Sequence, residues 1–280
     1  MLDGAWGTQL AAAGLPAGAC PEVWNLANAK AVEAVARGYV EAGSDAILTN
    51  TFGANRFLLA PHGLAGQVEE ICRKAAEISR RAAGDGVKVF GSIGPTGKIV
   101  MMGEVDRAEL EQAFGEAARG LEAGGADAIV LETFNELAEL GMALAAAKQE
   151  TSLPVVASMT FSHGPDKNRT MMGNSPEELV ELAEADGADA VGANCGLGPE
   201  RYVEIARMLR AAGPEMPVWI KPNAGMPRVG SDGRTSYPMG PDQFASYAPK
   251  LLEVGANFIG GCCGTTPKHI AALRKAVGNR

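Results

Sequence analysis

The chain has 280 residues, of which 46% are hydrophobic and 21% charged, so it is long and apolar enough to bury a large core. Its net charge is −8 and it has no basic run, which argues against a nucleic-acid partner or an anionic membrane surface, because both are bound mainly through clustered Lys and Arg. The start "MLDGAWGTQL" lacks a secretory signal pattern and no apolar run approaches the roughly 18 residues of a membrane span, so we expect a cytoplasmic protein.

Strands are predicted at regular intervals from the first residues onward. "MLDG" predicts a first strand, and four later segments share a Gly, a small residue, Asp or Asn, and then an apolar run: "GSDAILTNTF" (43–52), "GADAIVLETF" (125–134), "GADAVGANCG" (187–196) and "GANFIGGCCG" (255–264). This pattern is typical of a helix C-cap that runs directly into a buried strand. Short β-branched runs lie between them: "VKVFGSIGP" (87–95), "LPVVASMTF" (153–161) and "MPVWIKPNAG" (216–225).

The segments between the strands have helical spacing. Residues 107–124 and 175–186 carry apolar side chains at three- and four-residue steps, and Ser175 with Pro176 and Glu178 forms a helix-start signature. The repeated glycines are 82, 62 and 68 residues apart (43 to 125, 125 to 187 and 187 to 255), which fits two strand–helix units per interval. Eight strands alternating with helices therefore predict a (β/α)8 TIM barrel that forms a single domain over residues 1–280.

In such barrels the chemistry lies at the carboxyl ends of the strands. The polar or reactive residues that close the predicted strands are Asp3 and Gly4, Asn50 and Thr51, Ser92, Glu132 and Thr133, Ser158 and Thr160, Asn194 and Cys195, Asn223, and Cys262 with Cys263. Three of the five cysteines are in this set. In a reducing compartment, unevenly spaced cysteines favour metal binding or catalysis over disulfides.

The adjacent pair Cys262 and Cys263 is flanked by Gly260, Gly261 and Gly264. Neighbouring side chains in a regular strand face opposite ways, and glycines let the backbone leave that geometry so that both thiols can turn to one centre. With Cys195 as a third ligand, this predicts a catalytic zinc site with an open fourth position. The alternatives are a strained vicinal disulfide and a Cys195 that is only a small core residue. Lys221, at the end of the seventh predicted strand, is compatible with a Schiff-base lysine or with charge balance.

Several motifs carry a resemblance to a known family. "LDGAWGTQL", "TNTFGANR", "GSIGPTGK", "LETFNE", "GANCGLGP", "KPNAG" and "GGCCGTTPKHI" occur in this order, and the chain closely resembles the zinc-dependent homocysteine S-methyltransferases from Leu2 to about Val277. It is more similar to the homocysteine-binding module of cobalamin-dependent methionine synthase than to the betaine-dependent enzymes. The resemblance implies one zinc per chain bound by Cys195, Cys262 and Cys263.

The same resemblance implies a substrate site for homocysteine. It assigns Asp3, Gly4 and Glu132 to the amino-acid end of the substrate and places Asn223 near the metal. From the residue types we expect Asp3 or Glu132 to pair with the ammonium group, and backbone N–H groups around Gly4 and Ala5 to bind the carboxylate.

These features predict methyl transfer to homocysteine, forming methionine. Zinc deprotonates a bound thiol, and three thiolate ligands leave a substrate thiolate electron-rich enough to attack a methyl group. The resemblance to cobalamin-dependent methionine synthase implies methylcobalamin as the donor. Because the sequence contains no "DxHxxG" corrinoid signature, we expect the methylcobalamin to be free or carried by a separate corrinoid protein. The alternatives are betaine, S-methylmethionine or another onium donor, and a non-catalytic zinc- or corrinoid-protein-binding subunit. Retention of Asp3, Glu132 and the three cysteines weighs against the last of these.

Overall fold

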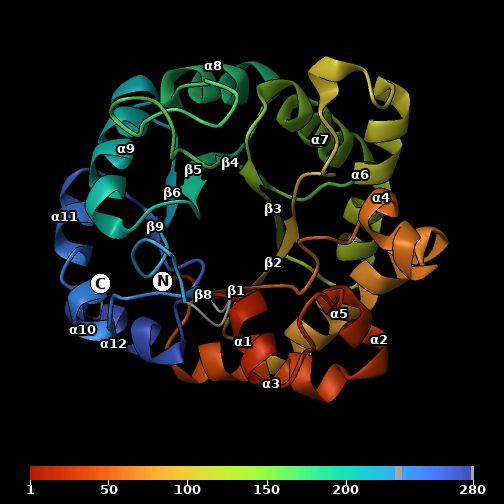
Figure 1. Cartoon of the computed structure of the whole chain (residues 1–280), viewed down its shortest axis with the longest axis horizontal. Coiled ribbons are helices and arrows are strands. Elements are labelled where there is room, and N and C mark those ends of the chain that lie inside the picture. Colours follow the sequence, from red (N-terminus) through yellow and green to blue (C-terminus); the bar gives the residue numbers. More distant parts are fainter. Residues whose placement is uncertain (231–234, 279–280) are drawn as a thin grey trace.

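The fold is built on one parallel sheet surrounded by helices. The computed structural model describes residues 1–230 and 235–278. Seven parallel strands neighbour one another in the order β1 (Ala46–Leu48), β2 (Lys88–Ile93), β3 (Ala128–Phe134), β4 (Val155–Met159), β5 (Ala190–Asn194), β6 (Val218–Lys221) and β9 (Phe258–Ile259). Figure 1 shows these strands curled around the centre of the molecule, with the helices on the outside.

The first residues of the chain contact both edges of this sheet. Leu2 forms a parallel bridge with Ala46 of β1, and its N–H donates to the Ile259 carbonyl oxygen of β9 at 2.8 Å. The N–H of Gly261 in turn donates to the carbonyl oxygen of Asp3 at 3.0 Å. Where the sequence predicts a first strand over "MLDG", the structure therefore has a single bridged residue, Leu2, that lies between β9 and β1.

Helices cover the outer face of the sheet. The longer ones are α3 (Ala29–Glu41), α5 (Val68–Ala83), α6 (Arg107–Ala123), α7 (Leu137–Glu150), α8 (Pro176–Asp186), α9 (Pro199–Ala212) and α12 (Pro267–Val277). The shorter ones are α1 (Gly7–Ala12), α2 (Trp24–Ala27), α4 (Arg56–Leu59), α10 (Pro241–Ala245) and α11 (Ala248–Glu253), with 3-10 turns η1 (Pro21–Val23), η2 (Ala60–His62), η3 (Ala65–Gln67) and η4 (Val100–Met102). An antiparallel hairpin joins β7 (Arg228–Val229) to β8 (Thr235–Ser236). None of the helices in the described part of the chain is both long and apolar enough to cross a membrane.

The predicted helix boundaries are confirmed where the sequence carried a capping signal. The segment predicted over 175–186 forms α8, and Ser175 and Glu178 make the reciprocal hydrogen bonds of a capping box. The segment predicted over 107–124 forms α6, whose first turn is capped by the side chain of Asp106. These local signals fix where each helix starts and hence where the preceding loop ends.

The sequence repeat has a structural cause at the amino ends of the strands. Its glycines, Gly43, Gly125, Gly187 and Gly255, all have positive φ, between 74° and 95°, as expected of residues that end a helix. The acidic or amide residue that follows caps the neighbouring strand: Asp127 accepts from the N–H of Val89, and Asp189 accepts from the N–H of Val155. The repeat therefore has a structural role at the amino ends of the strands, on the side of the molecule opposite their carboxyl ends.

Alternation along the strands separates two apolar clusters. The larger cluster includes Ile47, Val89 and Ile129 and packs between the sheet and the helices. The smaller cluster lies on the other face of the sheet and contains Leu2, Ala46, Leu48, Val130, Val156, Ala190 and Trp219. The Trp219 ring stacks on Phe90 at 5.4 Å between ring centroids. The space enclosed by the curled sheet is therefore filled by side chains at the level of this inner cluster.

A buried histidine predicts how stability depends on pH. His269 of α12 donates from Nε2 to the Met239 carbonyl oxygen at 3.0 Å and accepts the Thr266 N–H at Nδ1. Burial lowers the pKa of His269 below its ordinary value of 6.5. Because the unfolded chain then binds the proton more readily, we expect the stability contributed by His269 to be present above pH 6.5 and to be lost as pH falls through the lower folded-state pKa.

Urea unfolding of the zinc-free protein between pH 5 and 8 tests this expectation. The free-energy difference between wild type and His269→Gln should shrink as the pH falls, because glutamine takes up no proton. The matched control is His62→Gln, at an exposed position in η2. The assignment is wrong if the two variants show the same pH dependence relative to wild type.

Candidate active site and metal centre

A layer of polar side chains follows the inner apolar cluster toward the carboxyl ends of the strands. Because side chains alternate, a residue two positions beyond an inward apolar residue also faces inward. Ser92 thus follows Phe90, Glu132 follows Val130, and Ser158 follows Val156. The strands contribute Ser92, Glu132, Ser158, Asn194 and Lys221 to the layer, Asp3 joins it from the start of the chain, and all six side chains are buried.

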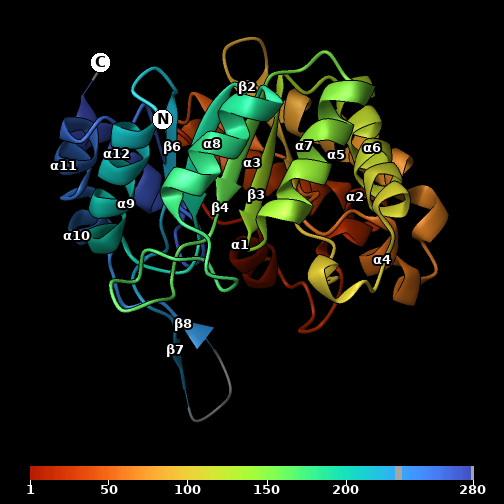
Figure 2. The same ribbon diagram turned by 90° about the horizontal axis from the view of Figure 1, so that it is seen from above.

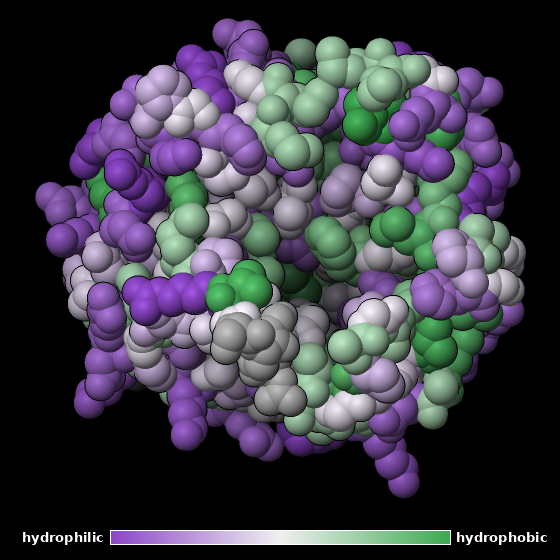
Figure 3. Space-filling view, in the orientation of Figure 1, coloured by the Kyte–Doolittle hydropathy of each residue, from purple (hydrophilic) through white to green (hydrophobic). Residues whose placement is uncertain are grey.

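This layer lies beneath an open face of the molecule. Figure 2 shows the β7–β8 hairpin, which follows β6, projecting from the side opposite the N-terminus, so this is the side on which the strands end. The space-filling view of the molecule is hollowed at its centre (Figure 3). A small molecule entering from this side would meet the polar layer before the apolar cluster.

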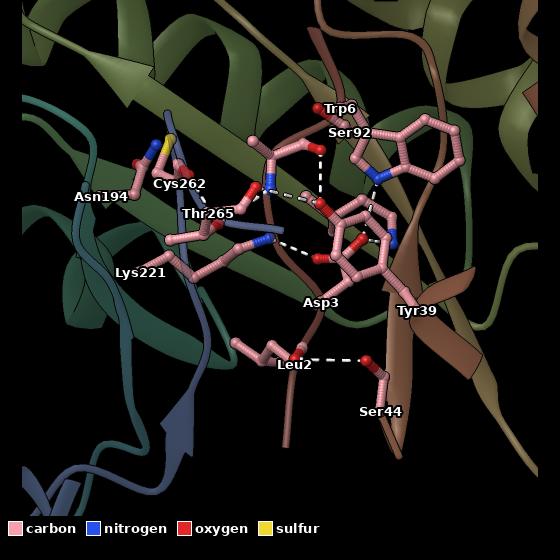
Figure 4. A network of polar contacts seen from close by, with 12 residues as sticks. Leu2, Asp3, Trp6, Tyr39, Ser44, Ser92, Asn194, Lys221, Cys262 and Thr265 are labelled. Carbon is pink, nitrogen blue, oxygen red and sulfur yellow. Dashed lines mark hydrogen bonds and ion pairs between the residues drawn. The ribbon is translucent and has the colours of Figure 1, made fainter. Parts of the chain in front are cut away.

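Asp3 and Lys221 form a buried ion pair within this layer (Figure 4). The Lys221 ammonium lies 2.5 Å from one carboxylate oxygen of Asp3, and the other oxygen accepts the Trp6 Nε1–H at 2.8 Å and the Leu48 N–H at 2.7 Å. Burial disfavours the charged ammonium, but the carboxylates of Asp3 and Glu132 outweigh burial and raise the pKa of Lys221. Lys221 is thus a paired cation, which agrees with charge balance and not with a free amine ready to form a Schiff base.

Glu132 is the second carboxylate of the layer. One of its oxygens accepts the Ser92 hydroxyl at 2.5 Å and the other accepts the Asn194 side-chain N–H at 3.3 Å. Burial raises the pKa of Glu132, against the opposing effects of Lys221 and the Ser92 hydrogen bond. Unlike Asp3, whose two oxygens accept three protein donors, Glu132 accepts only two hydrogen bonds among the described residues. Its carboxylate retains acceptor capacity for a ligand cation.

The three cysteines that the sequence singled out lie together. The Sγ atoms of Cys195, Cys262 and Cys263 are all within 4.8 Å of one another, and the Cys195 and Cys263 sulfurs are 3.9 Å apart. Cys195 directly follows β5, and its φ of +65° turns the chain away from strand geometry. Hydrogen bonds among the three thiols lower the pKa of Cys263 and raise the pKa of Cys262. Thiolates are preferred ligands of zinc and other soft or borderline cations.

Glycines and backbone hydrogen bonds fix the adjacent cysteines. β9 ends at Ile259, and a Cβ on Gly260 would lie 2.6 Å from the Asp3 carbonyl oxygen, so only glycine fits this approach. The Cys262 N–H donates to the Pro222 carbonyl at 2.8 Å, and the Cys263 carbonyl accepts the Ala224 N–H at 2.9 Å. The predicted departure from strand geometry at this point is confirmed.

Asn223 belongs to the same neighbourhood as the cysteines. The Asn223 N–H donates to the carbonyl oxygen of Leu197 at 2.9 Å, and Leu197 lies two residues after Cys195. The N–H of Ala224, which follows Asn223, donates to the Cys263 carbonyl oxygen. The Oδ1 atom of Asn223 is buried and has no hydrogen-bond partner among the described residues. A buried acceptor without a partner is costly unless a ligand or water satisfies it. The loop that carries Asn223 therefore has an unfilled polar position.

Gly4 and Ala5 connect Asp3 to the cysteine cluster. A Cβ on Gly4 would lie 2.7 Å from the Thr265 hydroxyl oxygen, so the backbone approaches that side chain closely. The Ala5 N–H donates to Thr265 Oγ1 at 3.1 Å, and this hydroxyl donates to the Cys262 carbonyl at 2.7 Å. The Ala5 N–H, which the sequence suggested for a substrate carboxylate, thus already has a protein acceptor. The Gly4 N–H has none among the described residues.

The remaining cysteines lie apart from this cluster. Cys72 is fully buried in α5, and the Cys20 thiol donates to the Glu22 carboxylate at 3.1 Å. Ser92, Asn194 and Lys221 are site residues to which sequence reasoning assigned no role in binding the substrate. The period-two alternation beyond Phe90, Ala190 and Trp219 could have identified them.

Comparisons with known proteins show which family the chain belongs to. A family model described as homocysteine S-methyltransferase matches residues 1–277. Methionine synthase from Mycobacterium tuberculosis is 35% identical over 295 residues, which cover 99% of this chain and 24% of that protein. Methionine synthase from Mycobacterium leprae is 33% identical over 293 residues, covering 98% of this chain and 24% of that protein. The chain thus spans about a quarter of the length of these curated relatives.

A solved structure has the same fold. The metallated form of the homocysteine methyltransferase MmuM from Escherichia coli matches with a TM-score of 0.79 and 23% identity, covering 98% of this chain and 94% of that chain. At this identity the match supports the fold alone. The family model covers nearly the whole chain, so the protein belongs to the homocysteine S-methyltransferase family, as its motifs predicted.

Proposed function

We propose that the chain transfers a methyl group to the thiol of homocysteine, forming methionine, with one zinc ion bound by Cys195, Cys262 and Cys263. The observation that carries this proposal is the meeting of three thiols beside a buried layer that contains a carboxylate with free acceptor capacity. Such a site offers a metal position at one end and an ammonium-binding position at the other. Homocysteine carries a thiol and an ammonium group at its two ends.

The residues present fit zinc. Three thiol ligands are the donor set of a zinc site that keeps its fourth position open. The loop that bonds the Cys263 carbonyl through Ala224 also carries the unpartnered Oδ1 of Asn223. Bound zinc would keep the substrate thiol deprotonated at neutral pH. In the reaction, the substrate sulfur forms the new S–CH3 bond, the bond from the methyl group to its donor breaks with its electron pair remaining on the donor, and the thiol proton goes to solvent.

The chain's other residues would bind and orient the amino acid. Glu132 would accept hydrogen bonds from the ammonium group, and the free N–H of Gly4 would bind the carboxylate. Asp3 would act with Lys221, because its oxygens already accept three protein donors. This refines the expectation from the sequence, in which Asp3 and Glu132 were equivalent candidates for the ammonium.

We also propose that the fold is a complete (β/α)8 barrel. The hydrogen bonds of Leu2 and Asp3 to both edges of the sheet support a closed (β/α)8 barrel in which the first residues act as the eighth strand. On this reading residues 1–280 form a single domain with one site. A cytoplasmic location, expected from the sequence, is part of the same proposal.

Methylcobalamin, free or carried by a separate corrinoid protein, is the proposed donor. Its support is the sequence similarity to proteins named methionine synthase over almost the whole chain. The decisive experiment incubates the zinc-loaded protein with homocysteine and each donor in turn and measures methionine. We expect methionine from methylcobalamin or a methylated corrinoid protein and little from betaine or S-methylmethionine. The reverse pattern would replace the donor assignment by an onium donor, and no methionine with any donor together with no homocysteine binding would favour a non-catalytic subunit.

Glu132→Gln is expected to weaken homocysteine binding while zinc is retained. Loss of a charge-assisted hydrogen bond costs about 1.5–3 kcal/mol, or roughly 10- to 150-fold in Kd. Isothermal titration of the zinc-loaded protein measures the effect. Glu177→Gln, an exposed residue in the first turn of α8, is the control for the same change of charge. Equal affinities of wild type and Glu132→Gln would remove Glu132 from the ammonium site.

A further inference from the structure

We propose that Asn194 is the positioning residue that fixes the direction of the Glu132 carboxylate and links the amino-acid end of the site to the cysteine end. This inference rests on the proposed function for its consequence in substrate binding. Asn194 is fully buried, and all of its side-chain hydrogen-bonding capacity is used. Its Oδ1 accepts the Thr133 N–H at 2.9 Å and the Ser158 hydroxyl at 2.8 Å, and its Nδ2 donates to Glu132 Oε2 at 3.3 Å and to Thr133 Oγ1 at 2.6 Å.

An irregularity in the sheet creates the need for this residue. The β3–β4 register pairs Leu131 with Ala157 and then Phe134 with Met159, so β3 carries one extra residue over this stretch. Thr133 lies within the bulge and has a φ of +66°, a conformation uncommon for a β-branched residue. Its N–H cannot continue the ladder to β4 and instead donates to Asn194, from the strand beyond β4.

Glu132 lies in the same irregular stretch, next to Thr133. An extra residue in a strand changes the direction of the neighbouring side chains, and here Asn194 bonds both residues of the irregular stretch, Glu132 and Thr133. It donates to the carboxylate of Glu132 and forms two hydrogen bonds with Thr133. Without these bonds nothing in β4 or β5 would fix the carboxylate of Glu132, because its second partner, Ser92, lies on β2.

The same residue leads into the cysteine cluster. Asn194 is the last residue of β5, its carbonyl accepts the Thr160 hydroxyl at 2.9 Å, and the next residue, Cys195, donates its N–H to the Lys221 carbonyl at 3.1 Å. The chain turns at Cys195, with a φ of +65°. The residue that contacts Glu132 and a predicted metal ligand are thus adjacent in the chain.

Only an asparagine amide satisfies all four contacts. Aspartate has the same shape but no N–H donor, and it would place a second carboxylate beside Glu132. Alanine would leave the buried Thr133 N–H without an acceptor. Aspartate therefore removes the N–H donated to Glu132, and alanine also removes the acceptor of the Thr133 N–H.

The first test needs no substrate. In the zinc-free protein, Asn194→Asp should lower the melting temperature by several degrees because two carboxylates then face each other, and adding Glu132→Gln should recover more than half of the loss. Ser158→Ala, which removes a contact to Asn194 without touching Glu132, is the matched control, and Glu132→Gln should give it no such recovery. Absence of recovery in the Asn194→Asp background would overturn the contact.

The second test concerns homocysteine. In the zinc-loaded protein, Asn194→Ala should raise Kd for homocysteine at least about fivefold with zinc content unchanged, and should have less than about a twofold effect in the Glu132→Gln background, because the two residues then act through one contact. Equal fold-changes in both backgrounds would show that Asn194 does not act through Glu132. If wild type binds no homocysteine at all, the proposed function fails, while the melting-temperature cycle still decides whether Asn194 positions Glu132.

Discussion

Replacing Cys262 and Cys263 together by alanine is expected to abolish both zinc retention and methyl transfer. The two thiols are two of the three groups that could hold a metal at this site, and their Sγ atoms lie within 4.8 Å of each other and of Cys195. Binding of zinc to thiolate sites is worth about 10–16 kcal/mol in structural examples, so loss of two ligands from three removes most of the affinity. Elemental analysis after gel filtration should give about one zinc per wild-type chain and almost none in the variant.

Cys20→Ala provides the control for this experiment. Cys20 is a half-buried cysteine that bonds Glu22 and lies outside the cluster. Its replacement should leave the zinc content and the methionine yield at the wild-type level. Zinc retained at full occupancy in the Cys262→Ala, Cys263→Ala variant would rule out these thiols as the metal site.

Lys221→Met is expected to destabilise the protein more than any other single change of charge discussed here. It would leave the fully buried Asp3 carboxylate without its cation, and breaking a buried pair in this way costs about 3–5 kcal/mol. Changing Asp3→Asn in the same chain should recover much of the loss, because no uncompensated charge then remains. Urea unfolding of the zinc-free protein at neutral pH measures both effects.

The control is an exposed pair of the same chemistry. Lys148 lies 2.9 Å from Asp189, with side chains 36% and 47% exposed. Lys148→Met should cost no more than about 1 kcal/mol, because solvent screens an exposed pair. If Lys221→Met and Lys148→Met destabilised the protein equally, the buried pair would not hold the site together as described.

The scaffold could be predicted where local sequence signals carry it. The repeated Gly occurs before every second strand and ends a helix, a role that depends only on neighbouring backbone groups. The Asp that follows Gly125 or Gly187 instead bonds a strand 38 or 34 residues earlier in the chain, a contact that the repeat alone does not specify. The capping residues of α8 are also local. The cysteine cluster could be predicted because Cys195 directly follows β5, Cys262 and Cys263 follow β9 after two glycines, and parallel strands bring their carboxyl ends to one side.

The rest of the site depends on contacts that no local pattern contains. Asp3 and Lys221 are 218 residues apart, and only the structure shows that their charges are paired. The contacts of Asn194, in β5, depend on a bulge in β3. The sequence of β5 gives no sign that β3 contains an extra residue. The predicted first strand is longer than the observed one: Leu2 bonds both edges of the sheet, but the chain leaves the sheet after Asp3 and enters α1 at Gly7.

X-ray absorption spectroscopy at the zinc edge, with and without homocysteine, tests the central claim most directly. The account predicts three sulfur ligands in the purified protein, from Cys195, Cys262 and Cys263, and four after homocysteine is added. The additional sulfur should be absent when homoserine, which has a hydroxyl in place of the thiol, is used instead. Zinc with fewer than three sulfur ligands, or a sulfur count that homocysteine leaves unchanged, would contradict the account.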